Sequence, residues 1–206
     1  MKLNFKTIIG FVVIAVVAYL CRPLNDKIAD VYIEKNEEEI SGNIEGHNYV
    51  DLGLSVKWAT CNIGASKPEE YGDSFVEKEK KESTMTAIHK SYLTATSQWG
   101  EPWRIPTKEE WNELKYKCTW KWTTVNRVNG YKITAKNGHS IFLPAAGYRN
   151  GIVIYNVGSY GFYWSSTVGD GNSGYTYRHI FNSSSKSTND SYFRYYYGYS
   201  VRPVTE

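Results

Sequence analysis

The residues best suited to binding chemistry gather toward the C-terminal end of the sequence. The part from Pro144 to Glu206 holds eleven of the eighteen tyrosines, ten serines and five asparagines, whereas Lys186 is its single lysine. Tyrosine offers a rigid, amphipathic contact area, and serine and asparagine offer adaptable hydrogen bonds, so this mixture is typical of recognition surfaces. The composition therefore favours binding over catalysis.

The candidate contact residues fall in three glycine-punctuated segments of this region. Exposed aromatic rings stack on sugars or anchor protein surfaces, while amides and hydroxyls fix the orientation of the ligand. Because strand alternation buries about half of such tyrosines, part of this set is expected to belong to the core. The predicted ligand-binding residues are Tyr148, Asn150, Tyr155, Asn156, Tyr160, Asn172, Tyr175, Tyr177, Asn182, Ser184, Asn189, Tyr192, Tyr195 and Tyr196.

No catalytic or metal-binding group stands out in the sequence. The four histidines (His47, His89, His139 and His179) are far apart, and none has a cysteine or carboxylate at metal-ligand spacing. Neither a nucleophile–base pair nor a phosphate-cradling loop is evident. We therefore predict no catalytic residues, no metal and no cofactor, and we do not expect an enzyme.

The N-terminus carries a targeting segment. Lys2 and Lys6 are followed by an uncharged run from Thr7 to Cys21, which is shorter than the roughly 20 apolar residues that span a bilayer comfortably. Three routes remain open: a cleaved signal peptide, a lipid-anchored Cys21 and an uncleaved membrane anchor. Each predicts export to the cell surface or outer envelope, and the lipid-anchored and uncleaved routes also predict contact with the membrane through this segment.

The charge of the chain bears on its partners, and its cysteines bear on disulfide formation. The net charge of +3 is small and the basic residues are spread along the chain, so we predict no nucleic-acid partner. Cys61 and Cys118 remain if Cys21 is removed or lipidated. Two alternatives stay open for them: a disulfide formed in an oxidising compartment, or two separately buried thiols.

Composition divides the chain into three parts. Residues 1–21 form the targeting segment, and the polar residues 22–46, which cannot bury much, are expected to form a stalk. Residues 47–206 are expected to form one folded domain, which is an ordinary size.

The clearest local signal predicts a helix of about three turns. Thr107 is its N-cap, Glu110 completes a capping box, and Trp111, Leu114 and Cys118 mark its buried face. An amphipathic helix is also expected over residues 84–97.

Short strands are expected after the helix that begins at Thr107. Asn129-Gly130 and Asn137-Gly138 have the composition of hairpin turns. Strands, two helices and then many short strands predict an α+β fold. The strand candidates in this part of the sequence are residues 131–135, 140–143, 163–167, 175–181 and 199–204.

Several stretches, taken in order, resemble one bacterial family. They are residues 49–65 (YVDLGLSVKWATCNIGA), 68–73 (PEEYGD), 103–107 (WRIPT), 118–122 (CTWKW), 141–149 (IFLPAAGYR), 163–166 (YWSS) and 198–204 (GYSVRPV). The set is similar to the major paralogous domain family, which comprises exported domains with a C-type-lectin-like fold. The resemblance implies a small twisted antiparallel sheet with two flanking helices. It also implies paired first and last strands and a long ligand-facing excursion after the second helix.

Related folds occur in formylglycine-generating enzymes and in the variable receptors of diversity-generating retroelements. Those enzymes use cysteines in the C-terminal part of the fold, but no cysteine follows Cys118. Calcium-dependent lectins use Glu-Pro-Asn and Trp-Asn-Asp motifs, from which Glu101-Pro102-Trp103 and Thr188-Asn189-Asp190 depart. The resemblance implies a surface-tethered module that binds an extracellular protein or glycan, with possible retroelement diversification. The alternative is a structural or adhesin-tip component of the cell envelope.

Overall fold

The computed structural model describes residues 41–76, 95–168, 176–189 and 197–206. The chain divides into two compact units, Met1–Glu37 and Glu38–Glu206, and all described residues belong to the second. The predicted targeting segment and most of the predicted stalk lie outside the described residues. Within the described part of the chain, no helix is long and apolar enough to cross a membrane.

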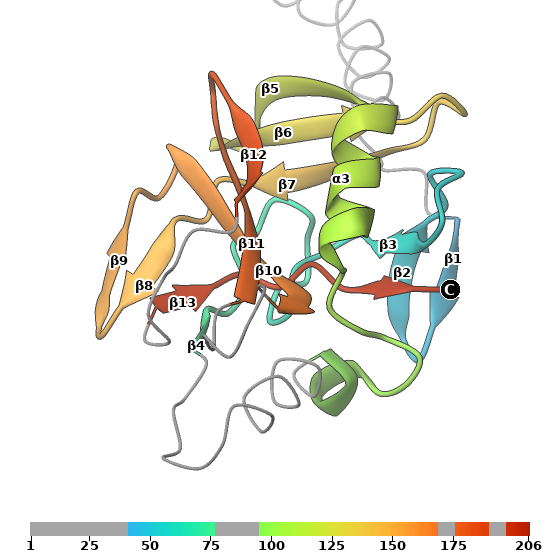
Figure 1. The fold of residues 1–206 in the computed structure, drawn as a ribbon, viewed down its shortest axis with the longest axis horizontal. Coiled ribbons are helices and arrows are strands. Elements are labelled where there is room, and N and C mark those ends of the chain that lie inside the picture. Colours follow the sequence, from blue (N-terminus) through green and yellow to red (C-terminus); the bar gives the residue numbers. More distant parts are fainter. Residues whose placement is uncertain (1–40, 77–94, 169–175, 190–196) are drawn as a thin grey trace, which may run out of the picture. The chain divides into compact units, whose positions relative to one another are not determined.

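The described residues of the second unit form short antiparallel strands, the helix α3 (Lys108–Lys117) and a short helical segment at residues 95–99 (Figure 1). The strands are β1 (Gly42–Ile44), β2 (His47–Val50), β3 (Lys57–Ala59), β4 (Phe75–Val76), β5 (Thr119–Val125), β6 (Val128–Thr134), β7 (Ser140–Pro144), β8 (Tyr148–Asn150), β9 (Val153–Tyr155), β10 (Tyr160–Val168), β11 (Thr176–Asn182), β12 (Lys186–Asn189), β13 (Tyr197–Tyr199) and β14 (Val204–Thr205). Four sheets result, with the strand orders β1-β2-β3-β14, β10-β11-β12, β4-β13-β8-β9 and β5-β6-β7.

The predicted α+β, C-type-lectin-like fold class is wrong. Of the described residues, 47% lie in strands and 12% in helices, and the strands form several small antiparallel sheets in place of one sheet flanked by two helices. Aromatic and β-branched residues dominate the chain after α3, and these residue types favour strands. The other expected helix contributes residues 95–99, and the rest of its predicted span lies outside the described residues.

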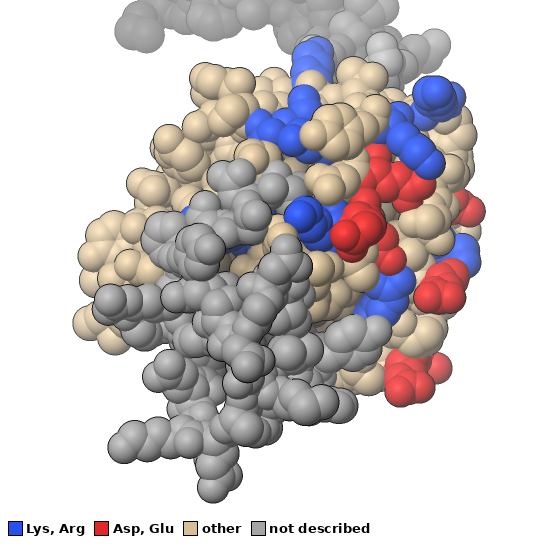
Figure 2. Space-filling model, viewed as in Figure 1, with Lys and Arg blue, Asp and Glu red and all other residues tan. Residues whose placement is uncertain are grey.

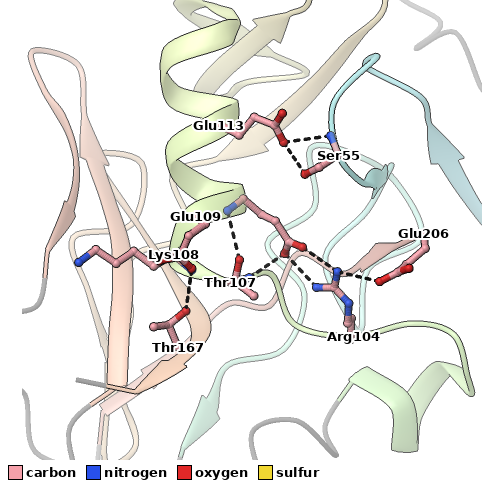
Figure 3. A network of polar contacts seen from close by, with 9 residues as sticks. Ser55, Arg104, Thr107, Lys108, Glu109, Glu113, Thr167 and Glu206 are labelled. Atoms are coloured by element: carbon pink, nitrogen blue, oxygen red, sulfur yellow. Dashed lines mark hydrogen bonds and ion pairs between the residues drawn. The ribbon is translucent and has the colours of Figure 1, made fainter. Parts of the chain in front are cut away.

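Helix α3 begins where the sequence predicts. The Thr107 hydroxyl accepts the N–H of Glu110 at 3.2 Å, and the Glu110 carboxylate accepts the N–H of Thr107 at 2.8 Å, which confirms the capping box. Figure 3 shows Thr107 and Arg104 beside the first turn, where Arg104 donates to both oxygens of the Glu110 carboxylate at 2.9 and 2.6 Å. Trp111 and Leu114 are buried, as expected.

One of the two predicted hairpin turns is wrong. Asn137-Gly138 does turn the chain between β6 and β7, but the β5–β6 turn uses Asn126-Arg127, whose φ angles are 46° and 69°. Asn129-Gly130 lies inside β6 instead. A Cβ on Gly130 would meet a backbone oxygen of β7 at 2.3 Å, so close strand approach, not a turn, requires this glycine.

The stalk boundary at residue 46 also needs correction. Strand β1 pairs with β2, with Gly42 opposite Tyr49, so the folded unit includes residues assigned to the stalk. At the other end of this sheet, β14 pairs with β3 and sets Val204 opposite Trp58. The sheet therefore joins segments from both ends of the folded unit.

Arg202, between β13 and β14, is fully buried and links three segments. Its Nε donates to Asn62 Oδ1 at 2.9 Å, its Nη2 donates to the Phe142 carbonyl at 2.9 Å, and its Nη1 donates to two carbonyls. Those two belong to Ala59, at 3.0 Å, and to Thr60. Hydrogen bonds from a charged donor are stronger than neutral ones, so this Arg202 network ties the segment after β3 to β7.

His179 on β11 belongs to the core as well. Its ring stacks on Trp111 with a centroid distance of 4.7 Å and an interplanar angle of 3°. Burial, together with the positive charges of Lys115 and Lys186, lowers the pKa of His179 to about 3. The imidazole is therefore neutral at physiological pH and acts as a packed ring.

Candidate functional site

Strands β8 and β9 form a hairpin at one edge of their sheet (Figure 1). Their two-residue turn starts at Gly151, whose φ of 59° suits the first central residue of a type II′ turn. Asn150 is paired with Val153 next to the turn, and Tyr148 is paired with Tyr155 at the other end. Because β8 pairs with β13 on its inner side, β9 is the outer strand.

Close backbone packing fixes the base of this hairpin. Gly147 has a φ of 69°, and a Cβ there would meet the carbonyl oxygen of Tyr155 at 2.1 Å, so glycine is required at this position. The N–H of Gly147 donates to the Tyr160 carbonyl at 2.8 Å. The N–H of Gly158 donates to the Ala145 carbonyl at 2.7 Å. Backbone hydrogen bonds between the segments before and after the hairpin therefore fix its base.

The hairpin exposes five apolar side chains that are near neighbours in the sequence. The exposed fraction is 97% for Ile152, 47% for Val153 and Ile154, and 42% for Tyr155 and Val157. Figure 2 shows uncharged surface over the outer ends of β8 and β9, whereas charged side chains gather around α3. We define the hairpin surface as Tyr148, Asn150, Ile152, Val153, Ile154, Tyr155 and Val157.

A row of aromatic rings leads from the hairpin surface into the core. Tyr155 stacks on Tyr148 at a centroid distance of 5.4 Å, and Tyr148 meets Phe162 edge-on at 5.0 Å. Phe162 then stacks on Tyr199 at 5.7 Å, while Tyr197 packs edge-on against Tyr148 at 5.3 Å. Such ring pairs contribute about 0.5–1.5 kcal/mol each beyond their buried area. The row therefore holds the hairpin surface in a defined position.

A buried arginine supports the inner end of this row. The Cζ atom of Arg178 lies 5.6 Å from the Phe162 ring centre and 5.3 Å from that of Tyr199, and its Nη1 donates to the Tyr199 hydroxyl. Burial lowers the pKa of Arg178 and raises the pKa of Tyr199 to about 12. Both groups keep their protons at neutral pH, so the contact persists there.

The structure brings some of the predicted contact residues together. Three of them belong to the hairpin surface: Tyr148, Asn150 and Tyr155. Asn156 is exposed directly after β9, but its φ of 60° and its carbonyl, which accepts the N–H of Tyr160 at 3.0 Å, make it a turn residue. Tyr160 is half-buried and stacks on Phe162 at 5.9 Å. In the hairpin, Tyr148, Asn150 and Tyr155 belong to the exposed surface, whereas Asn156 shapes the turn that follows β9.

Other predicted contact residues lie in the β10-β11-β12 sheet. Tyr177 is buried, with Lys108 Nζ 3.9 Å from its ring centre. Asn182 Oδ1 accepts the N–H groups of Ser184 and Ser185, each at 2.8 Å, and so closes the β11–β12 turn. For Tyr177 and Asn182 the prediction of ligand contact is corrected to a core role and a turn role, because asparagine in tight turns bonds its own backbone.

The remaining predicted contact residues do not add to the hairpin surface. Asn189 is the last residue of β12. Five lie outside the described residues: Asn172, Tyr175, Tyr192, Tyr195 and Tyr196.

The sequence prediction missed the apolar members of the hairpin surface, namely Ile152, Val153, Ile154 and Val157. A signal for them does exist. A run of β-branched residues follows Asn150-Gly151, and no charged residue or proline occurs between Asn150 and Val168. Such a run is typical of an apolar strand that pairs with another chain.

The thiols and acidic groups form no separate site in the described residues. Cys61 and Cys118 are half-buried and are not joined by a disulfide. Burial raises the pKa of Cys118 to about 11, and the negative charge of Glu113 raises it in the same direction, so the thiol stays protonated and weakly nucleophilic. No cluster of three His, Cys, Asp or Glu side chains in the described ranges could hold a metal ion.

In comparisons with known proteins, no family model, curated protein or solved structure matches the chain. Membership of the major paralogous domain family therefore stays a prediction. We therefore infer the function from the arrangement of the hairpin surface.

Proposed function

We propose that this protein is an exported, surface-tethered binding module that recognises a protein partner through the hairpin surface. The observation that carries the proposal is the group of five neighbouring apolar side chains exposed on one hairpin, with Ile152 at 97% exposure. Contiguous apolar patches on soluble proteins mark interaction sites more often than they occur by chance. The tether is the N-terminal targeting segment expected from the sequence.

The chemistry of the surface favours a protein over a glycan. Sugar recognition needs an open aromatic face beside hydrogen-bonding groups, but one face of Tyr155 is covered by Tyr148. The most exposed members are aliphatic instead (Ile152, Val153 and Ile154), and aliphatic side chains gain most from burial against another apolar surface.

A structural role in the cell envelope is the second candidate. Permanent interfaces are more hydrophobic than transient ones, and the hairpin surface carries no charged side chain. A fixed stoichiometry with one partner after purification favours the structural role. Reversible binding at equilibrium favours recognition.

Site-specific photo-crosslinking tests the proposal. A benzophenone side chain is placed at Val153 in the full chain, and a matched probe is placed at Tyr116 of α3, which is 74% exposed. We expect protein adducts from Val153 in cells that produce the chain, and their loss when Ile152→Ser and Ile154→Ser are combined. Equal adducts from both positions, or adducts only with glycans, would contradict the proposal.

A further inference from the structure

Strand β9 is a three-residue edge strand that carries no charged residue, proline or bulge. It ends the strand order β4-β13-β8-β9, so one side of its backbone faces away from the sheet. Proteins commonly guard such edges with charged residues, prolines or bulges. Here, no charged residue or proline occurs from Asn150 to Val168, and β9 pairs with β8 in an unbroken register.

The register shows which backbone groups are turned outward. In a two-residue hairpin the pair flanking the turn exchanges both backbone hydrogen bonds, and the next pair does not. Asn150 and Val153 flank the turn, and Arg149 and Ile154 form the next pair. Ile154 therefore directs its N–H and C=O away from β8, toward the position that another strand would occupy.

The side chains of β9 offer contacts on both faces of that position. Val153 and Tyr155 share one face with Tyr148, and Ile154 lies on the opposite face, since side chains alternate along a strand. Each of these three β9 side chains is between 42% and 47% exposed. Ile152 and Val157 extend the apolar contact beyond the two ends of the strand.

We propose that β9 accepts an extended, uncharged apolar segment of a protein partner as an additional strand of the β4-β13-β8-β9 sheet. The inference rests on the proposed function and specifies its partner. Main-chain hydrogen bonds at Ile154 provide part of the affinity, and alternating contacts with Ile154 on one face and with Val153 and Tyr155 on the other select the partner's side chains.

The small size of the edge favours a flexible segment over a second copy of the chain. A stable complex of two globular proteins buries about 800 Å² on each partner. The edge consists of three residues, and its apolar area is divided between two faces of one strand. A second folded domain cannot reach both faces at once, whereas an extended segment can follow the edge and fold over either face.

The test uses a synthetic peptide of alternating valine and threonine, capped at both ends and carrying a short polyethylene glycol chain at one end for solubility. A matched peptide carries N-methyl groups on all of its amides, so its side chains are kept and its N–H donors are removed from both edges. Both are titrated into the full chain. We expect the first peptide to bind and to slow amide exchange at Ile154 about tenfold, which corresponds to one net hydrogen bond, and the second not to bind.

Two variants of the full chain locate the contact. Ile154→Pro removes the outward N–H while leaving the β8 pairing positions intact, and it is expected to weaken peptide binding about tenfold. Ile154→Val keeps the N–H and a branched side chain, so affinity should stay within about twofold. Because Ile154→Val and the methylated peptide need no change of backbone, the test holds even if the proline variant misfolds.

Several results would overturn strand addition. They are equal binding of the two peptides, no binding at about 1 mM peptide, or dimers of the full chain that protect Ile154 in the absence of peptide. If Val153 still forms protein crosslinks in that case, the hairpin surface binds proteins by its side chains and the proposed function stands. If those crosslinks are also absent, the proposed function fails.

Discussion

Arg202 is fully buried and directs its donors to protein oxygens, whereas Ile152 is 97% exposed at the tip of a hairpin. The Arg202 network places a charge inside the protein and satisfies it there. The hairpin surface places apolar side chains outside and leaves them uncovered. Buried charges and exposed apolar groups are both unfavourable unless they have partners. The Arg202 network is thus satisfied within this chain, and we propose that the hairpin surface is covered by a partner.

This contrast predicts that stability and binding can be separated by mutation. Changes in the Arg202 network should lower the free energy of unfolding. Changes at the hairpin surface should alter binding and leave that free energy nearly constant.

Arg202→Met should have the largest effect. It leaves Asn62 Oδ1 and the carbonyls of Ala59, Thr60 and Phe142 without their donor, and we expect a loss of roughly 3–5 kcal/mol in the free energy of unfolding. Urea denaturation of the full chain measures it. Arg202→Lys keeps the charge without the planar fork, so it should also destabilise the protein. A loss below about 1 kcal/mol for the methionine variant would show that the network is dispensable.

Gly147→Ala tests the junction between the two regions. The new Cβ would meet the Tyr155 carbonyl oxygen, and the φ of 69° is unfavourable for alanine, so we expect a cost of about 2–4 kcal/mol. Gly151→Ala is the matched control, since its φ is also positive, at 59°, but no atom lies within 4 Å of its Cβ. It should cost about 1 kcal/mol. Equal costs in urea denaturation would contradict the close packing at Gly147.

The buried ring of His179 should make stability depend on pH. The folded state has a pKa of about 3 and the unfolded chain one of about 6.5, so the unfolded chain takes up the proton first. Stability contributed by the neutral ring is therefore complete above pH 6.5 and decreases as the pH falls, by about 2 kcal/mol at pH 5. Urea denaturation from pH 7 to pH 5 measures the slope. His179→Phe should reduce the slope, and an unchanged slope would assign it to other groups.

Ile152→Ser should have the smallest effect on stability. The side chain is almost fully exposed, so the free energy of unfolding should change by less than about 0.5 kcal/mol. Ile63→Ser, at a position that is 1% exposed, is the matched control and should cost about 3 kcal/mol or more. If Ile152→Ser destabilised the protein by more than about 1 kcal/mol, the hairpin tip would be a structural element.

Local signals predicted the local structure well. The capping box at Thr107 and Glu110 depends on four consecutive residues, and it forms as expected. The turn at Asn126-Arg127 could not be predicted in the same way, because Asn129-Gly130 has the stronger turn composition. The pairing of β6 with β7 overrides that preference, since it needs Gly130 where the two backbones come close.

The binding surface could be predicted only in part. The abundance of tyrosine and asparagine pointed to Tyr148, Asn150 and Tyr155, which lie together on the hairpin. The same rule also selected Tyr177, which is buried, because composition does not reveal which face of a strand meets the core. The exposure of Ile152 depends on the hairpin extending beyond the core, and isoleucine is ordinarily expected inside.

The order in which the two regions form follows from their sequence separation. Gly151 joins β8 and β9 over a few residues, and isolated hairpins form within about 1–10 μs. The pairing of Trp58 with Val204 joins distant parts of the sequence and must wait for a slow loop closure. During synthesis and refolding, the apolar edge thus exists before the core closes. We expect a chaperone or the partner itself to be needed early, to prevent the edges of neighbouring nascent chains from pairing.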